Sequence, residues 1–350
     1  MNVSTPDLEA SAKPPAISPE NKRRVKRVLM ALAIPSLFSF SLMVFVTLFF
    51  PYDKLRDYLV ASFNAQQRAT NGQFELKIET MGPWWPPGVK ARGVHLKSLQ
   101  VDPTKPPIEM EIAEIRGRVS LLPLLWFTQR IGFEIDAFQG HIDGRVDLSS
   151  ASRRVVVEVD DIELGDATMV GAQIGLPLLG KLKGKVDLTM PEGKASKGNG
   201  TVQFDGVDMA VGDGKAPIQT PMGPFTIPKL VIGPLAISAE AKDGKLTVTK
   251  LAAQGRDVDV AGDGKITMRE MAAESPVDVS LKFKINDSYR AKNEKTKTLF
   301  GDPSKPASGL GAGLIDMDPT MKKAKQADGF YVFRLGGKLG RLKPEAVGGR

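Results

Sequence analysis

The feature that most restricts this chain is an uncharged, apolar run near its start. Residues 28–50 read VLMALAIPSLFSFSLMVFVTLFF and contain no Asp, Glu, Lys, Arg or His. As a helix, a run of this length measures about 35 Å, enough to cross a hydrocarbon layer of about 30 Å. The alternative is a cleaved secretory signal, whose apolar stretch is usually shorter and ends at small residues; TLFFPYDKL supplies none. The run therefore predicts a single retained transmembrane helix at residues 28–50.

Flanking charges predict the orientation of this helix. The charges in YDKLRD, which follow the run, cancel one another, whereas five basic residues precede it: Lys22, Arg23, Arg24, Lys26 and Arg27. Because basic flanks remain in the cytoplasm, we expect a cytoplasmic N-terminus and a single pass through the inner membrane of a bacterium. Residues 1–27 are then a disordered cytoplasmic tail, and residues 51–350 form a periplasmic domain.

Composition restricts the function classes further. The 35 glycines and 25 prolines, with only 7% aromatic residues, favour many turns between short strands. The absence of cysteine excludes thiol catalysis, thiolate metal sites and disulfides. The net charge of +8 is too mild to favour nucleic-acid binding, so no nucleic-acid partner is predicted.

Short alternating segments dominate the chain after residue 70. A glycine and a basic residue open several of them, as in GRVDL, GKVDL, GKLTV and GKITM, whose glycines are Gly144, Gly184, Gly244 and Gly264. These glycines are interpreted as turns, because no phosphate-loop motif surrounds them. Tight hairpins are also predicted at Asp-Gly pairs that begin at Asp143, Asp205, Asp213, Asp243 and Asp263.

The alternation predicts a mainly β fold. Within GKVDLTM, Val186 and Leu188 share one face of a strand and Lys185 and Asp187 share the other. A long antiparallel sheet with one apolar face must curl, close or be covered. We therefore expect a curled sheet, of half-barrel or open-barrel form, that encloses either a core or a groove for acyl chains.

Two segments depart from the strand pattern. Residues 52–69 carry apolar residues at helical spacing and predict a short amphipathic helix. Residues 286–329 are charged and then glycine-rich, which predicts a helix near 288–299 within a flexible insertion. Alternation resumes in FYVFRLGGKLGRL, the predicted last strand.

Adjacent tryptophans in MGPWWPPG form a rigid corner. Trp84 and Trp85 lie between prolines, which excludes a regular helix. The corner could be the lip of an active site, a membrane-interface anchor or a packed bend between strands, and the packed bend is favoured. Together with Tyr58, these residues are the candidate interface or packed corner.

No motif predicts an enzyme. His95 and His141 lie in strand-like stretches without metal-ligand spacing, and no G-x-S-x-G elbow occurs. DVDVAGDGK resembles a calcium loop but has Ala261 where an oxygen ligand is needed. We therefore predict no catalytic, cofactor-binding or metal-binding residues.

Three stretches carry a resemblance to a known family. PWWPPGVKARGVHL, GKLTVTKLAAQGRDVDVAGDGKITM and FYVFRLGGKLGRLKP resemble the type II secretion system protein N (GspN) family. The anchor, the tryptophan corner and the "DGKL" strands are also similar to AsmA-like envelope proteins. The basic insertion at 286–329 and the tail after Pro344 depart from the secretion family.

The two resemblances imply different functions. The first implies a non-enzymatic, inner-membrane-anchored subunit of the type II protein secretion system that contacts other subunits of the inner-membrane platform or the secretin. The second implies a lipid-binding or lipid-transfer protein with phospholipid bound in an apolar groove. Neither resemblance supplies catalytic residues or a cofactor.

Overall fold

The computed structural model describes most of the chain, in two compact units. The described residues are 19–69, 74–84, 88–98, 109–120, 128–167, 176–215, 217–220, 223–226, 228–305 and 313–348. The first unit ends at Phe50 and the second begins at Pro51. Each is described by itself.

The described part of the first unit consists of one helix. Helix α1 spans Pro19–Phe49 and contains Pro35. Large apolar side chains along it are exposed, among them Ile34, Leu37 and Phe38. No single helix in the described part of the chain passes a length and hydropathy test for a membrane span, although Ala33–Phe49 and Tyr52–Arg68 pass it as a bent pair.

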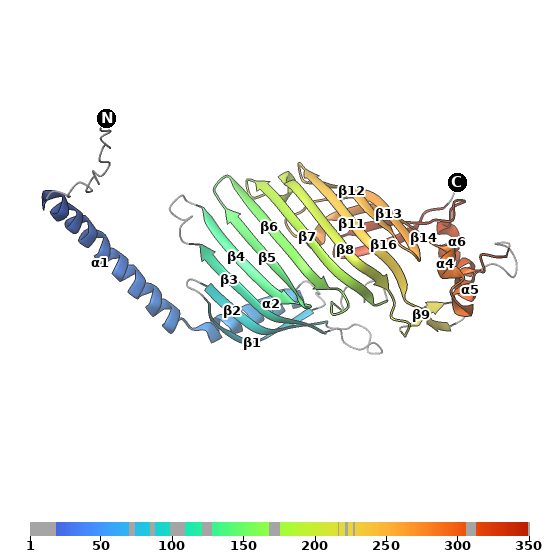
Figure 1. Ribbon diagram of the computed structural model, residues 1–350, viewed down its shortest axis with the longest axis horizontal. Coiled ribbons are helices and arrows are strands. Elements are labelled where there is room, and N and C mark those ends of the chain that lie inside the picture. The colour runs from blue at the N-terminus through green and yellow to red at the C-terminus, as the bar shows by residue number, and fades with distance from the viewer. Residues whose placement is uncertain are drawn as a thin grey trace, which may run out of the picture. The chain divides into compact units, whose positions relative to one another are not determined.

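The second unit is built on a 14-stranded antiparallel sheet (Figure 1). Its strands, in spatial order, are β1 (Phe74–Trp84), β2 (Gly88–Ser98), β3 (Glu109–Ser120), β4 (Gln129–Ala137), β5 (Gly140–Leu148), β6 (Ser152–Glu163), β7 (Leu178–Pro191), β8 (Asn199–Val211), β11 (Leu230–Lys242), β12 (Lys245–Gln254), β13 (Val258–Thr267), β14 (Pro276–Ile285), β15 (Tyr331–Lys338) and β16 (Arg341–Ala346). A separate hairpin joins β9 (Pro217–Thr220) and β10 (Gly223–Thr226). The prediction of a mainly β, antiparallel domain is confirmed.

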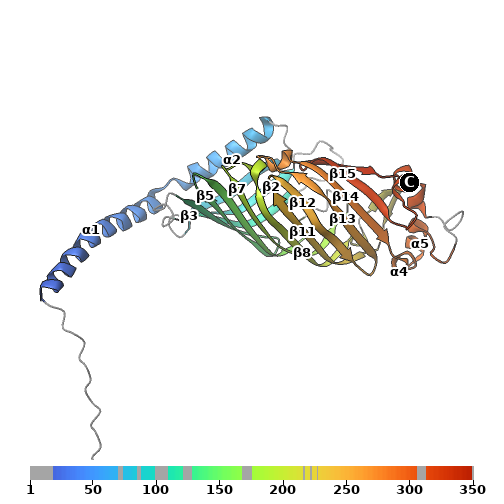
Figure 2. The same cartoon turned by 90° about the horizontal axis from the view of Figure 1, so that it is seen from above.

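The sheet is open and bowed. β1 and β16 are its two edges and do not pair with each other. Figure 2 shows β15 lying across from β8 and β11, so the sheet bends back on itself. β-Bulges or irregular register recur in its ladders, for example between Val159 and Ile162 in β6 and beside Gly233 in β11. Bulges bend a strand and increase its twist, which explains how so wide a sheet curls.

Glycines in the middle of strands have a different role from the predicted one. Gly144 lies inside β5 and Gly184 inside β7. A Cβ at Gly144 would overlap the ring of Phe133 in β4, and one at Gly184 would overlap the ring of Phe204 in β8. Each glycine therefore admits an aromatic ring from the neighbouring strand onto its own face.

The turn and hairpin interpretation is consequently wrong at most of these positions. Gly264 lies within β13, and the pairs that begin at Asp143, Asp205 and Asp263 also lie within strands. Only Asp243-Gly244 forms a tight hairpin, between β11 and β12. Asp213-Gly214 lies in the loop after β8. An Asp-Gly pair does not by itself distinguish a turn from a strand position that must leave room for a ring.

Helix α2 covers the edge of β1. It spans Tyr52–Ala69, the residues predicted to form an amphipathic helix. The Asn64 amide donates to the Leu76 carbonyl oxygen at 3.1 Å and accepts from the Leu76 N–H at 2.8 Å. Arg56 donates to the carbonyl oxygen of Glu79 at 3.2 Å. Side chains of α2 thus take the place of a neighbouring strand and protect an otherwise free edge.

The segment after β14 is more helical than predicted. It forms α4 (Asp287–Arg290), α5 (Glu294–Phe300), a 3-10 turn at Leu314–Met317 and α6 (Pro319–Ala324). Asn293 and Thr296 form a reciprocal capping box at the start of α5. Tyr289, Leu299 and Ala324 are buried, so these helices pack firmly onto the domain.

Replacement of Gly184 by alanine tests the ring-over-glycine packing. We expect Gly184→Ala to lower the free energy of unfolding by about 1–3 kcal/mol, because Phe204 must leave its position. Gly117→Ala is the matched control, since Gly117 also lies within a strand but its Cβ would meet nothing within 4 Å. Denaturant unfolding followed by far-UV circular dichroism measures the free energy of unfolding of both variants. Equal losses in the two variants would contradict the packing argument.

Candidate functional site

The candidate site is the apolar face of the large sheet. Residues directly opposite one another on neighbouring strands place their side chains on one face, so the register identifies what each row across the sheet contains. One unbroken row runs from β3 to β16 through Gly117, Phe133, Gly144, Val157, Val186, Val202, Ala239, Val248, Gly264, Val279, Leu335 and Pro344. None of these residues is polar.

A second row runs beside the first. It consists of Val119, Ile131, Val146, Val155, Leu188, Gly200, Ala241, Leu246, Ile266, Val277, Gly337 and Leu342. With neighbouring strands about 4.8 Å apart, each row extends about 50 Å along the sheet. The two rows define a long strip without a charged or hydrogen-bonding side chain, here called the apolar strip.

Coverage of the apolar strip changes along its length. Val119 and Ile131, on β3 and β4, are each 38% exposed, whereas Val277 and Val279 on β14 are 6% and 8% exposed. Between these ends, Val157, Val186 and Val202 are half-buried. The strip is therefore open to solvent toward β3, covered at β14 and open again at β16, where Leu342 is 40% exposed.

Loops at one set of strand ends form a rim beside the strip. Arg153, at the start of β6, continues the apolar face beyond Leu148 and donates to the carbonyl oxygen of Gly193 at 2.5 Å and to Glu270 at 3.1 Å. Glu270 also accepts from the Ala195 N–H at 2.7 Å. These bonds join the β5–β6, β7–β8 and β13–β14 connections into one edge.

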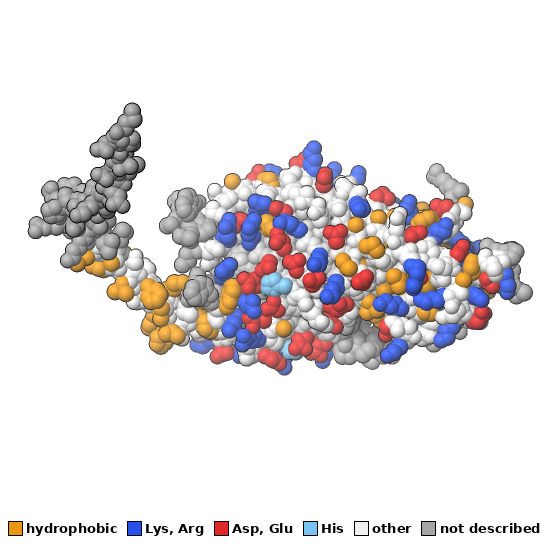
Figure 3. Space-filling view, in the orientation of Figure 1, with side chains coloured by type: hydrophobic (Ala, Val, Ile, Leu, Met, Phe, Trp, Pro, Cys, Tyr) orange, Lys and Arg blue, Asp and Glu red, His pale blue; other side chains and the backbone are white. Residues whose placement is uncertain are grey.

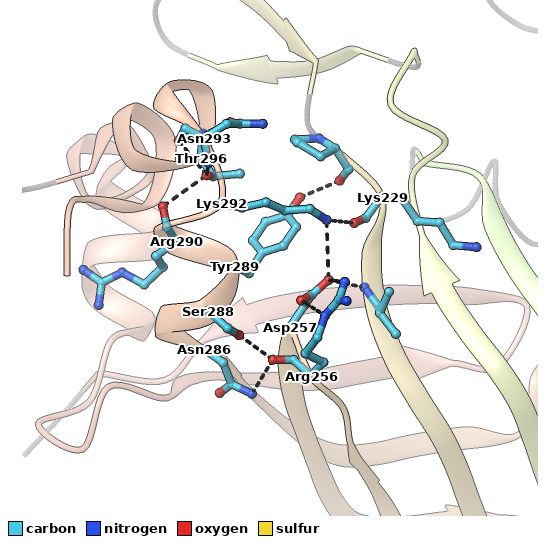
Figure 4. Close-up of polar contacts among 12 residues, drawn as sticks. Lys229, Arg256, Asp257, Asn286, Ser288, Tyr289, Arg290, Lys292, Asn293 and Thr296 are labelled. Carbon is cyan, nitrogen blue, oxygen red and sulfur yellow. Dashed lines mark hydrogen bonds and ion pairs between the residues drawn. The ribbon is translucent and has the colours of Figure 1, made fainter.

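Helices cover another part of the apolar face, near residues 283–285 of β14. Tyr289, Leu299 and Phe300 form a core cluster with Leu230 and Val258, against which Phe283 and Ile285 also pack. The Tyr289 hydroxyl donates to the carbonyl oxygen of Pro228 at 2.5 Å (Figure 4). Burial raises the pKa of that hydroxyl, so it stays protonated as a donor. The helices thus cover the apolar face where β13 begins and β14 ends, beyond the two rows of the strip.

A buried carboxylate attaches these helices to the sheet. Asp257 accepts from the Val231 N–H at 3.0 Å and from Arg256 Nε at 2.9 Å, and Lys292 Nζ lies 3.8 Å from it (Figure 4). Burial acts to raise the pKa of Asp257, but the hydrogen bonds from Arg256 and Val231 and the charge of Lys292 outweigh it, so the pKa is lowered. Asp257 therefore remains ionised and links β11, β13 and the helical segment.

The opposite face of the sheet is charged. Figure 3 shows acidic and basic side chains interspersed over this side of the domain. Many pair across strands: Arg130 with Asp147, Arg154 with Asp187, Lys185 with Glu158, and Arg116 with Glu134. A depression between β3 and β7 is lined by several members of these pairs, such as Arg130, Glu134 and Arg154, together with Gly132 and Val156. Because its charges are largely matched, it does not specify a charged ligand.

The predicted corner residues are only partly described. Trp84 ends β1, opposite Gly88, and Arg118 Cζ lies 5.5 Å from the centre of its ring. The half-buried Trp84 thus packs on the charged face. Tyr58, on α2, is 69% exposed. Trp85 lies outside the described residues.

The predicted topology residues lie on α1, but their side chains are outside the described part of the structure. These residues are Lys22, Arg23, Arg24, Lys26 and Arg27.

Both histidines pair with carboxylates on the strands. His95 lies 3.4 Å from Glu79 and 3.6 Å from Glu109. His141 Nδ1 lies 2.6 Å from Asp136 and Nε2 lies 3.2 Å from Asp143. Burial acts to lower the pKa of His141, but the two aspartates outweigh it and the pKa is raised. In the described residues, no group of three His, Cys, Asp or Glu side chains is arranged to hold a metal ion.

Comparisons with known proteins add no relative to this description. No family model, curated protein or solved structure matches the chain.

The Asp257 network allows a direct test of how the helical segment is attached to the sheet. We expect Asp257→Ala to lower the free energy of unfolding by about 1–3 kcal/mol at pH 7, because it leaves the buried Val231 N–H unpaired. The native pKa is lowered, so this contribution is present above the unfolded value of about 3.9 and disappears as the pH falls through the native value. Denaturant unfolding at several pH values measures the difference.

Asp259→Ala is the matched control for this variant. Asp259 lies two residues further along the chain, within β13, and is half-buried. We expect its replacement to change stability by less than about 0.5 kcal/mol. A difference between wild type and Asp257→Ala that persisted undiminished below pH 3 would contradict the electrostatic role.

Proposed function

We propose that this protein is a non-enzymatic, membrane-anchored lipid-binding protein of the bacterial envelope. The apolar strip carries this proposal, because its two rows contain only apolar residues and glycine and remain half-buried over their middle part. A water-exposed apolar surface of this extent is costly unless something covers it. Phospholipid acyl chains are suitable occupants, since each buried methylene contributes about 0.8 kcal/mol and needs no polar partner.

The anchor in this proposal is the apolar run at residues 28–50. Its exposed Leu37, Phe38 and Phe45 favour contact with lipid. The five basic residues before it would keep the N-terminus cytoplasmic and place the sheet in the periplasm. Lipid taken from the adjacent membrane could then be sheltered on the strip.

Two substitutions on neighbouring residues of β8 test lipid binding. Val202 belongs to the apolar strip, and Thr201 lies next to it on the charged face, opposite Asp187. We expect Val202→Lys to lose most of the phospholipid that co-purifies with the wild type in mild detergent, because a charged group then lies among the acyl chains. Thr201→Lys should retain it. Mass spectrometry of the extracted lipid measures the amount of phospholipid per protein in each variant and in the wild type.

The control for folding is far-UV circular dichroism of both variants. Absence of phospholipid from the wild type, or equal phospholipid in two folded variants, would overturn the proposal.

A free sheet edge favours a second candidate, a subunit of the type II secretion system. In the described residues β16 pairs only with β15, and residues 341–345 are exposed. An unpaired edge can accept a strand from a partner protein. The partner would be an inner-membrane platform subunit or the secretin, as the sequence resemblance implies.

Cysteine crosslinking tests this second candidate, because the chain has no cysteine of its own. We expect Lys343→Cys on β16 and Tyr58→Cys on α2 to crosslink to secretion subunits in living cells. Thr201→Cys, on the charged face, should not. Equal yields from all three positions, or recovery of no secretion subunit, would count against the secretion role.

A further inference from the structure

The net charge of this protein is concentrated at its C-terminal end. The chain has 48 basic and 40 acidic residues, and residues 282–350 contain 15 of the basic and 7 of the acidic ones. The rest of the chain therefore has 33 basic and 33 acidic residues. The whole net charge of +8 therefore resides in the last fifth of the chain. Eleven of those 15 basic residues are lysines.

Two unpaired lysines project from the charged face of β14. The Nζ atoms of Lys282 and Lys284 each lie 5.7 Å from the centre of the Phe330 ring. Neither forms an ion pair in the described structure, although many cations on the same face of β3–β7 do. The carboxylate of nearby Asp328 accepts from the Phe330 N–H.

Two further unpaired lysines lie on the adjoining helix. Lys322 and Lys323 are exposed on α6, which packs against β15 and β16. A Cβ at Gly348 would lie 3.9 Å from Lys323 Cγ. The preceding residue, Val347, donates its N–H to the carbonyl oxygen of Val332, which lies opposite Lys282 in the sheet. The two lysine pairs therefore flank one end of the β14–β16 ladder.

The fold fixes this basic corner firmly. Tyr331 donates to Asp316 at 2.8 Å and Lys325 donates to the same carboxylate at 2.6 Å. These bonds attach the turn before α6 to the start of β15. The corner is therefore a fixed surface, and we define it by Lys282, Lys284, Lys322 and Lys323.

Exposed apolar side chains accompany the corner. Met317 is 68% exposed just before α6, and Val347 is 40% exposed beyond β16. Lysine is a flexible, strongly hydrated point charge, whereas arginine forms the bidentate bonds typical of specific protein partners. Lysine clusters beside exposed apolar side chains are typical of surfaces that bind anionic lipid headgroups.

We propose that the basic corner binds the anionic surface of a phospholipid membrane. The four lysines provide attraction to the headgroups, and Met317 and Val347 provide apolar contact at the interface. This contact is separate from the apolar strip and from the anchor at residues 28–50. It would hold the C-terminal end of the domain against a membrane whether or not the strip carries lipid.

Vesicle binding by the full chain tests the proposal. The protein is reconstituted into neutral phosphatidylcholine nanodiscs. It is then mixed with vesicles of phosphatidylcholine alone or of phosphatidylcholine with about 30% phosphatidylglycerol, which supplies a negative surface potential. We expect the quadruple change of Lys282, Lys284, Lys322 and Lys323 to Gln to weaken binding to the anionic vesicles at least about tenfold. Added salt should weaken wild-type binding as well, because it screens the charges.

A second quadruple variant removes the same charge elsewhere. In this variant Lys77, Lys97, Lys242 and Lys250 are each changed to Gln. These four lysines are exposed and form no ion pair in the described structure. They lie in the part of the chain that has no net charge. We expect it to bind anionic vesicles as the wild type does. Circular dichroism confirms that both variants are folded.

Three outcomes would overturn the proposal. The first is equal binding of the wild type to neutral and anionic vesicles, and the second is equal weakening by the two quadruple variants. The third is binding to soluble polyglutamate without binding to anionic vesicles, which would identify an acidic protein as the partner. Failure to co-purify phospholipid would instead affect only the proposed function of the apolar strip.

Discussion

The alignment of apolar side chains into continuous rows across the large sheet is the constraint on which the rest of the structure depends. Within the first of these rows, each ladder from β3 to β16 places an apolar residue or glycine opposite another, so Gly117 in β3 and Pro344 in β16 belong together. A slip of one residue in any ladder would move charged side chains such as Lys185 into that row. Cross-strand pairs on the other face, such as Arg154 with Asp187, favour the same register.

Curvature follows from how the apolar face is filled. Phe133 and Phe204 occupy the space above Gly144 and Gly184, where any larger residue would exclude them. Bulges in several ladders then bend the strands, so the sheet curls without closing. The apolar strip lies on a surface that is curved and only partly covered, which suits a lipid-sheltering role better than a dry structural core.

Different elements cover the sheet at β1 and near β14. At β1, Asn64 and Arg56 of α2 bond to the backbone of the edge strand. Near the end of β14, the helices after residue 286 cover the apolar face through Tyr289 and Leu299, and Asp257 ties them to β11 and β13. The same helical segment carries unpaired lysines outward. Packing and charge therefore coincide at the C-terminal end, where the domain is both closed and strongly basic.

The amino-acid sequence was sufficient for features that depend on local periodicity. Alternation predicted the strands and the separation of charged from apolar faces, and helical spacing predicted α2 with its bounds. These signals are local, because a side chain's face depends only on its place along its own strand or helix.

Pairing decided what local periodicity could not. Gly144 and Gly184 were predicted to form turns, because the sequence does not reveal that an aromatic ring from another strand lies over them. The bond between Asn64 and Leu76 and the burial of Asp257 likewise depend on segments distant in the chain. The continuous apolar strip exists only because neighbouring strands align row by row, and that alignment is a property of the folded sheet.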